Sequence, residues 1–301
     1  MRKIKLNGMF VPHVTPFSRV GELDLTALRT CLRFWLKGGV SGLVPCGSNG
    51  EAPYLSREER IRVIETVMDE VNGKVPVLAG TGSMSTKETI LFTSDAKDLG
   101  VDAALVVTPF YFKPSNREIY EHYKAVLEAV DIPIVLYSVP KFTGFSLEPT
   151  VIAQLASEYE NVIGVKDSGG NLGIITETMR MVGDKVSVLA GTADLALSAL
   201  MLGGSGAVLA VANVFPMMCS DLYGAFLKGD YEKAGNLQRS LSFINEVLVK
   251  RFNQLSAIKE ALNVLGLPAG NPRKPADPLG EGEKKEVKNL IRSMQGHESK
   301  L

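Results

Sequence analysis

Short apolar runs recur through the first 213 residues, with polar or helix-like stretches between them. Each run has the length of a strand, is rich in Val, Ile, Leu and Ala, and is closed by Gly, Pro, Thr or Ser. Hydrophobicity within a run is continuous rather than alternating, which is typical of parallel strands covered on both faces. The pattern predicts eight strands, within residues 8–17, 42–47, 75–82, 102–110, 133–140, 161–167, 186–192 and 206–213.

The stretches between the runs carry helix start signals. Three serine–glutamate pairs have the spacing of a capping box: Ser56 with Glu59, Ser85 with Glu88, and Ser115 with Glu118. In each pair the serine hydroxyl is expected to accept from a backbone N–H while the glutamate reaches back. A strand-to-strand spacing of roughly 20–35 residues fits alternating strands and helices.

Eight such units predict a closed (β/α)8 TIM barrel in preference to an open doubly wound sheet. No GxGxxG motif follows the first run, which weakens a dinucleotide-binding interpretation. From about Phe215 onward the apolar runs stop, and the chain reads as helices with a Pro/Gly-rich connector at 268–280. We therefore expect a barrel over residues 1–215 and a C-terminal helical extension over 216–301, packed together as one structural domain.

Composition restricts the class of partner. Lysine plus arginine and aspartate plus glutamate number 33 each, so no basic surplus points to nucleic acid. Residues 1–10 lack an apolar core long enough for a signal peptide, and the weakly polar run 203–218 is short for a membrane span. The three cysteines are separated and odd in number, which argues against a disulfide framework. A soluble, cytoplasmic protein is expected.

Metal and cofactor signals are weak. The three histidines, His13, His122 and His297, are scattered and do not have the spacing of metal ligands. We expect neither a metal nor an organic cofactor.

Reactive groups of a barrel gather where its strands end, and one lysine stands out there. Lys166 directly continues the apolar run NVIGV. Period-two counting places it with Val162 and Gly164 on one face, and we expect this face to point into the barrel. Burial there would lower the pKa of the amine and suit it to attack a ketone. The alternative is a lysine at a strand end with its ammonium in water.

Three other strand ends carry candidate polar groups. Tyr137 follows the apolar residues IVL, so it is either a general acid and base or a residue that fills the barrel. Ser48 and Asn49, in GSNGE, offer hydroxyl, amide and backbone donors to a carboxylate. Tyr111, in TPFYF, either joins the site or packs a loop. Glu51 and Asp167 are expected to be turn and helix-end partners.

Together these motifs resemble the dihydrodipicolinate synthase and N-acetylneuraminate lyase superfamily of class I aldolases. The resemblance covers nearly the whole chain. It rests on GSNGE (47–51), AGTG (79–82), TPFY (108–111), YSVP (137–140) with TG (143–144), GVKD (164–167), LAGTAD (189–194) and AN (212–213).

The resemblance implies roles for specific residues. Lys166 would form an imine with pyruvate, and Tyr137 would relay protons. Ser48 would join a hydroxyl relay with Tyr111, which a neighbouring subunit would supply. The remaining implied substrate-binding residues are Gly47, Ser48, Asn49, Ser168, Gly191 and Leu209. The family needs no metal or organic cofactor and usually forms homotetramers, as dimers of dimers.

Departures from the family pattern bear on the second substrate. Dihydrodipicolinate synthases usually carry an arginine two residues after the proline of their YNVP motif, and Phe142 stands there. A phenyl ring cannot form a bidentate pair with a carboxylate. The adjacent Lys141 is expected to point elsewhere. Residues Arg57, Arg60, Met84 and Phe110 stand where the lysine-feedback site of some synthases would lie, so that site is expected to be absent.

The combination of GSNGE, YSVP and KDSGG most resembles 4-hydroxy-2-oxoglutarate aldolases, with 2-keto-3-deoxygluconate aldolases a near second. The leading hypothesis is therefore aldol cleavage of a hydroxylated 2-oxo acid, or its reversal. One alternative is condensation of pyruvate with aspartate semialdehyde by a dihydrodipicolinate synthase. A ligand sensor without catalysis and a metal-dependent barrel aldolase are alternatives from other classes, and the sequence does not identify the second substrate.

Overall fold

The computed structural model describes residues 6–298, with side chains through Met294. The first five residues of the segment considered for a signal peptide, and the side chain of His297, lie outside this part. Eight parallel strands form a ring in the order β2-β1-β8-β7-β6-β5-β4-β3. A single parallel bridge between Leu43 and Val77 joins its two ends. The strands are β1 (Gly8–Val11), β2 (Gly42–Leu43), β3 (Leu78–Gly80), β4 (Ala103–Val107), β5 (Ile134–Ser138), β6 (Val162–Asp167), β7 (Ser187–Ala190) and β8 (Gly206–Val208).

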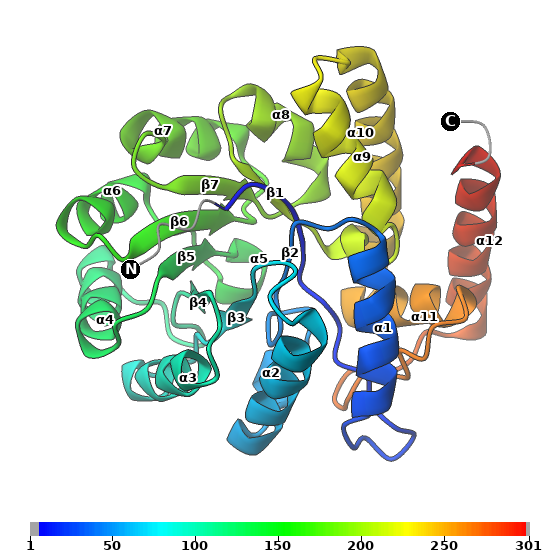
Figure 1. Cartoon of the computed structure of the whole chain (residues 1–301), viewed down its shortest axis with the longest axis horizontal. Helices are drawn as coiled ribbons and strands as arrows, with labels where there is room; N and C mark the ends of the chain where they lie inside the picture. Colours follow the sequence, from blue (N-terminus) through cyan, green and yellow to red (C-terminus); the bar gives the residue numbers. More distant parts are fainter. Residues whose placement is uncertain (1–5, 299–301) are drawn as a thin grey trace.

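Helices cover the outside of the ring, as Figure 1 shows, and the predicted (β/α)8 barrel is confirmed. The helices between and after the strands are α1 (Leu25–Lys37), α2 (Arg57–Val71), α3 (Thr86–Asp98), α4 (Asn116–Ala129), α5 (Pro140–Thr143), α6 (Pro149–Glu158), α7 (Leu172–Val182), α8 (Ala196–Met201) and α9 (Pro216–Leu227). Short 3-10 turns are η1 (Ala52–Tyr54), η2 (Ala193–Leu195) and η3 (Ala210–Asn213).

The three predicted serine caps behave differently. Ser56 and Ser115 form complete capping boxes with Glu59 and Glu118. Ser85 accepts from the Glu88 backbone N–H, but its box is incomplete. The Glu88 carboxylate instead accepts from the Ser83 hydroxyl at 2.9 Å, and this contact replaces the return bond to the backbone.

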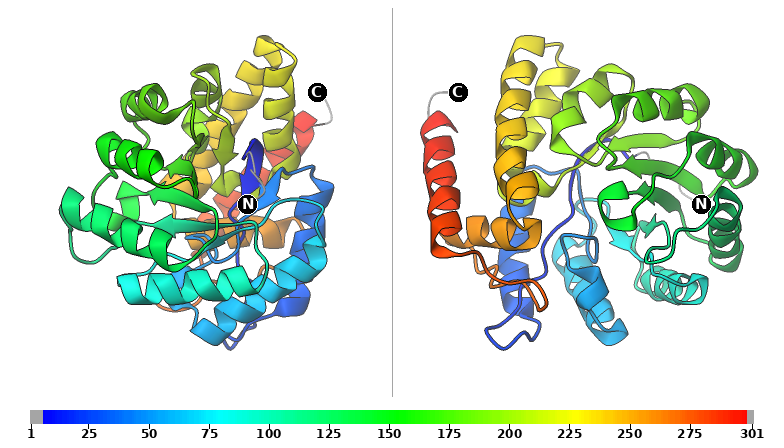
Figure 2. Two further views of the ribbon diagram at one scale, coloured as in Figure 1. Left: turned by 60° about the vertical axis from the view of Figure 1, so that its left-hand side comes forward. Right: turned by 180° about the vertical axis from the view of Figure 1, so that it is seen from behind.

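The C-terminal extension stands on one side of the barrel in Figures 1 and 2. It comprises α10 (Tyr231–Asn245), the π-helix η4 (Glu246–Arg251), α11 (Gln254–Val264) and α12 (Glu281–Glu298). Apolar residues of α10, α11 and α12 join the same buried cluster as the barrel helices, which supports one structural domain. Because α9 packs against β1, we propose that α9 is the eighth barrel helix and that the extension begins at α10, not at residue 216.

Two hydrophobic cores result from the alternation of side chains along the strands. The larger lies between strands and helices, and the smaller, which includes Phe10, Val135 and Tyr137, fills the barrel. One prediction about β6 is wrong. A register irregularity opposite Ile134 and Val135 places Val162 in the outer core, whereas Gly164 still faces inward toward Leu6 and Val135. A bulge therefore breaks the period-two count before Gly164.

Among the described helices, none is both long and apolar enough to cross a membrane. The weakly polar run 203–218 is instead divided among β8, η3 and the start of α9.

Candidate active site

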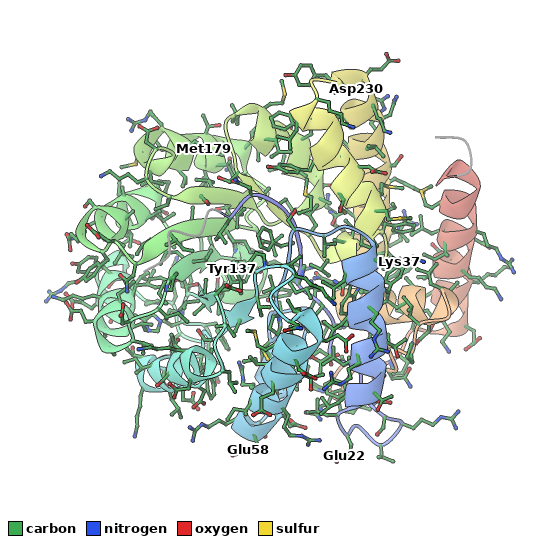
Figure 3. All side chains as sticks on the ribbon, in the orientation of Figure 1. Glu22, Lys37, Glu58, Tyr137, Met179 and Asp230 are labelled. Atoms are coloured by element: carbon green, nitrogen blue, oxygen red, sulfur yellow. The ribbon has the colours of Figure 1, made fainter. Side chains whose placement is uncertain are left out.

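Tyr137 and Lys166 meet inside the barrel. They are register partners on the adjacent strands β5 and β6, so both side chains point to the same face. The Lys166 Nζ lies 4.0 Å from the centre of the Tyr137 ring. Both residues are buried, and Figure 3 labels Tyr137 near the middle of the molecule in this view. The expected inward direction of Lys166 therefore holds, and the structure does not place its ammonium in bulk water.

Ser168, Ser48 and Lys166 lie near enough to the Tyr137 hydroxyl to act on its pKa by hydrogen bonding. Burial alone would raise the pKa of the phenol. The positive charge of Lys166 and the three hydrogen bonds oppose this effect and together exceed it, so the pKa of Tyr137 lies below its ordinary value. The tyrosine is therefore more readily deprotonated than a free phenol.

A cavity of about 280 Å³ brings most of the candidate residues together. Its lining includes Lys166 and Tyr137 with Ser48, Asn49, Ser168 and Gly191. A second cavity of about 650 Å³ adjoins it, shares Ser48 and Tyr137, and has Gly47 in its wall. These residues thus come from the ends of four strands, β2, β5, β6 and β7, which meet at one cavity.

Tight turns shape the loop that carries Gly47, Ser48 and Asn49. The Gly50 N–H donates to the Gly47 carbonyl at 3.0 Å, and the Glu51 N–H donates to the Ser48 carbonyl at 3.1 Å. The Asn49 side-chain oxygen accepts from Gln254 of α11. Sequence reasoning missed Gln254, because a polar residue at a helix start carries no sign of a partner far away in the chain.

Ser168 and Gly191 form the wall opposite this loop. The Ser168 hydroxyl donates to the Gly191 carbonyl at 3.2 Å, and the Gly191 N–H donates to the Asp167 carbonyl at 2.6 Å. A Cβ at position 191 would lie 2.0 Å from the Ser168 hydroxyl oxygen, so glycine is required there. Burial raises the pKa of Asp167, whose carboxylate accepts from the Gly169 N–H as a turn partner.

Two predicted residues lie apart from the cavities of this chain. Tyr111 is 84% exposed with a φ of 82°, and its ring packs edge-on against Phe112. Leu209 is buried in the outer core, while its neighbours Val208 and Ala210 line the smaller cavity. The Leu209 side chain faces the helices because it alternates with Val208, so its expected substrate contact is not seen for the side chain.

The prediction that the Lys141 side chain points away from the site is wrong. Its side chain lines both cavities, and its Nζ donates to the Val249 carbonyl at 2.9 Å and to Gln254 at 3.2 Å. Lys141 belongs to the one-turn helix α5, which turns its side chain toward the cavities although it is adjacent to Phe142. Phe142 lines both cavities as well and is half exposed.

The extension supplies polar groups that sequence reasoning did not find. Lys250 of the π-helix and Asn245 line the smaller cavity, and both contact Asp194 of η2. The Lys250 Nζ lies 2.6 Å from an Asp194 carboxylate oxygen, and the Asn245 amide donates to the same oxygen at 3.1 Å. Asp194 stands in the LAGTAD motif, but a π-helix has no distinct sequence pattern, so Lys250 could not be placed.

Three of the four residues that stand at the positions of the lysine-feedback site line the larger cavity. Arg60, Met84 and Phe110 line it, while Arg57 lies outside and pairs with Asp95 at 2.7 Å. Arg60 donates to the carbonyls of Gly80 and Ala52.

Among the described side chains, which end at Met294, no group of three or more His, Cys, Asp or Glu residues is arranged to hold a metal ion. His13 and His122 are buried, and burial lowers the pKa of each imidazole to about 4. Their Nδ1 atoms contact the Val14 carbonyl and the Thr86 hydroxyl.

Comparison with known proteins gives consistent results. Residues 5–294 match the model of the dihydrodipicolinate synthetase family. A 4-hydroxy-tetrahydrodipicolinate synthase from Methanospirillum hungatei is 40% identical over 94% of this chain and 98% of its own length. The protein of that name from Methanocaldococcus jannaschii is 38% identical over 95% and 98%.

Solved structures with this architecture are also similar. Dihydrodipicolinate synthase from Aquifex aeolicus superposes with a TM-score of 0.92 and 34% identity, over 96% of this chain and 98% of that one. YagE, a prophage protein of the same family from E. coli K12, was solved in complex with pyruvate. It gives a TM-score of 0.92 and 32% identity, over 96% and 99% of the two chains.

Proposed function

The chain belongs to the dihydrodipicolinate synthetase family and is a lyase-type enzyme, and from that premise we propose that Lys166 forms a Schiff base with a 2-oxo acid. The observation that carries the proposal is the buried contact between the Lys166 amine and Tyr137 in a cavity lined by hydrogen-bond donors. A ligand sensor without catalysis gains no support from this family, and no metal-binding group among the described residues favours a metal-dependent aldolase.

In the proposed reaction, the Lys166 amine attacks the C2 carbonyl of the 2-oxo acid, and water leaves to give a protonated imine. In the cleavage direction, Tyr137 removes the proton from the C4 hydroxyl. The C3–C4 bond then breaks, an aldehyde departs, and the electron pair moves into the imine to give an enamine. Protonation at C3 and hydrolysis release pyruvate and the free amine. The lowered pKa of Tyr137 suits the proton-transfer steps.

We assign the carboxylate of the 2-oxo acid to the loop of Gly47, Ser48 and Asn49. This loop lies beside Tyr137 and presents hydroxyl and amide groups to the cavities. Ser168 and Gly191 complete the opposite wall of the smaller cavity. In this arrangement the C2 carbonyl would face Lys166 while the carboxylate binds to uncharged donors.

For the second substrate we propose a hydroxylated, uncharged aldehyde portion. Of the described residues that line the smaller cavity, the only cations are Lys141, Lys166 and Lys250. Lys250 is neutralised by Asp194, and Lys141 donates to Val249 and Gln254. Asp194, Asn245 and Thr192 offer hydrogen bonds to hydroxyl groups instead. This lining favours 2-keto-3-deoxy sugar acids over 4-hydroxy-2-oxoglutarate, which carries a second carboxylate.

A second candidate follows from the names of the relatives. Proteins 38–40% identical to this chain are called 4-hydroxy-tetrahydrodipicolinate synthase, and those names do not support the preference for a 4-hydroxy-2-oxoglutarate aldolase. In a synthase with this lining, Lys141 would have to leave Val249 and bind the semialdehyde carboxylate in place of the missing arginine.

We also propose a cytoplasmic homotetramer built as a dimer of dimers. The exposed, strained Tyr111 supports a second copy that packs over it and receives its ring, since positive φ is costly for a tyrosine. The buried free thiols of Cys31, Cys46 and Cys219 are compatible with a reducing compartment.

A substrate panel tests the choice. kcat/KM should be compared for 2-keto-3-deoxygluconate, 4-hydroxy-2-oxoglutarate, and pyruvate with aspartate semialdehyde. The proposal predicts the highest value for the sugar acid. A preference for aspartate semialdehyde would identify the synthase candidate as correct.

A further inference from the structure

We propose that Lys259, in the C-terminal extension, is a positioning residue for the carboxylate-binding loop 47–51 and acts on it through Glu51. This inference rests on the proposed function, in which that loop holds the carboxylate of the 2-oxo acid. Lys259 lies on α11, outside the barrel, and lines neither of the two described cavities.

The contact between the two residues is buried and close. The Lys259 Nζ lies 2.6 Å from one Glu51 carboxylate oxygen, and the two side chains are 1% and 0% exposed. The other carboxylate oxygen accepts from the backbone N–H of Arg273 at 2.8 Å. Glu51 itself adopts a left-handed conformation with a φ of 57°, which a glutamate keeps only when its surroundings hold it there.

A change in the position of Glu51 would also move Gly47, Ser48 and Asn49, because backbone hydrogen bonds connect them. The Glu51 N–H donates to the Ser48 carbonyl, and the Gly50 N–H donates to the Gly47 carbonyl. These bonds make the loop one short, stiff unit. At the carboxyl end of the loop, Glu51 pairs with Lys259, and at its centre Asn49 accepts from Gln254. Both partners lie on the helix α11.

Lys259 is itself fixed in place. Its Nζ donates to the Asn271 carbonyl at 3.0 Å and lies 4.3 Å from the centre of the Phe17 ring. The Arg273 guanidinium lies 4.2 Å from the same ring and bonds to Glu59, Gly21 and Tyr54. The position of the loop is therefore tied to the connector that follows α11.

Burying an ion pair costs free energy, because both charges lose their hydration. Burial lowers the pKa of Lys259 to about 8, against the opposing effect of Glu51. The other charged or titratable groups that face it are Arg273, which also lowers the pKa, and Cys31, which raises it. Lys259 is charged below about pH 8 and loses its charge above it, so the ion pair weakens as the pH rises.

The test uses pyruvate as the probe and borohydride trapping on the full chain as the readout. Lys259→Met removes the charge and keeps a similar length. Lys284→Met is the matched control, because the Lys284 side chain on α12 is 35% exposed and pairs with Glu281. We expect Lys259→Met to raise the pyruvate concentration for half-maximal trapping by about tenfold or more. The adduct formed at saturating pyruvate should stay on Lys166 and be as abundant as in the wild type, and the control should match the wild type throughout.

Two further measurements separate positioning from a loss of folding. In the wild type, the pyruvate concentration that gives half-maximal trapping should increase once the pH exceeds about 8. The double variant Glu51→Gln/Lys259→Met, which leaves no unpaired buried charge, should not show this increase. An unchanged half-saturating concentration in Lys259→Met, or the same pH-dependent rise in the double variant, would overturn the inference. Failure of the wild type to be trapped at all would instead reject the proposed function.

Discussion

Tyr137 and Lys166 are paired across β5 and β6, with the amine of one 4.0 Å from the ring centre of the other. Parallel pairing fixes this relationship, because register partners on neighbouring strands point to the same face. The pair puts a nucleophilic amine and a group able to transfer protons at one point of the barrel interior.

Tyr137→Phe should keep the fold and lower kcat by about 10²–10⁴, the usual contribution of a positioned acid–base group. The phenyl ring retains the packing and the contact with the Lys166 amine, and only the hydroxyl is lost. Melting temperature and circular dichroism would report the fold, and turnover would be measured over the substrate panel. Near-wild-type turnover with every substrate would return Tyr137 to a purely structural role.

The pH dependence of kcat should reflect the lowered pKa of Tyr137. As the pH rises through that pKa, a larger fraction of the tyrosine becomes phenolate and able to act as a base, so kcat should increase with a midpoint below 10. Tyr137→Phe should lack this limb. If the variant and the wild type show the same rise, another group is the base.

Phe142→Arg tests the second-substrate proposal. A charge-assisted hydrogen bond to a carboxylate contributes about 1.5–3 kcal/mol, or about 10–150-fold in specificity. Phe142 lines both cavities, so an arginine there should raise kcat/KM for aspartate semialdehyde relative to a sugar acid by a factor in this range. Phe142→Leu controls for loss of the ring. A wild type that already prefers aspartate semialdehyde would mean that another cation, with Lys141 the nearest candidate, binds the carboxylate.

EDTA should leave the activity unchanged, and no added cofactor should be needed, because the proposed chemistry uses the amine of Lys166 and the hydroxyl of Tyr137. Activity would be measured after dialysis against EDTA and again after divalent ions are restored. Loss of activity that one divalent ion specifically reverses would contradict the mechanism.

Strand-end reasoning predicted that Lys166, Tyr137, Ser48 and Asn49 lie together, and all four line one cavity, because a parallel barrel gathers the carboxyl ends of its strands at one mouth. The same reasoning misplaced Val162, since a bulge shifts the alternation and leaves no mark in an apolar run. The expectation that Lys141 points away from the site was also wrong, because the one-turn helix α5 turns its side chain toward the cavities.

Contacts between distant parts of the chain were not predictable from local patterns. Glu51 was expected to be a turn partner, but its carboxylate pairs with Lys259 in a buried site. Gln254 and Lys250 reach the cavities only because the extension folds back against the barrel mouth. Such contacts depend on how helices pack, and a periodic pattern gives only the buried face of each helix.

The most direct test of the Schiff-base claim is mass spectrometry of the protein after treatment with pyruvate and borohydride. The account predicts one reduced pyruvate adduct, located on Lys166 by peptide mapping and absent from Lys166→Arg and Lys166→Ala. An adduct on a different lysine, or an unlabelled protein that nevertheless turns over a 2-oxo acid, would contradict it.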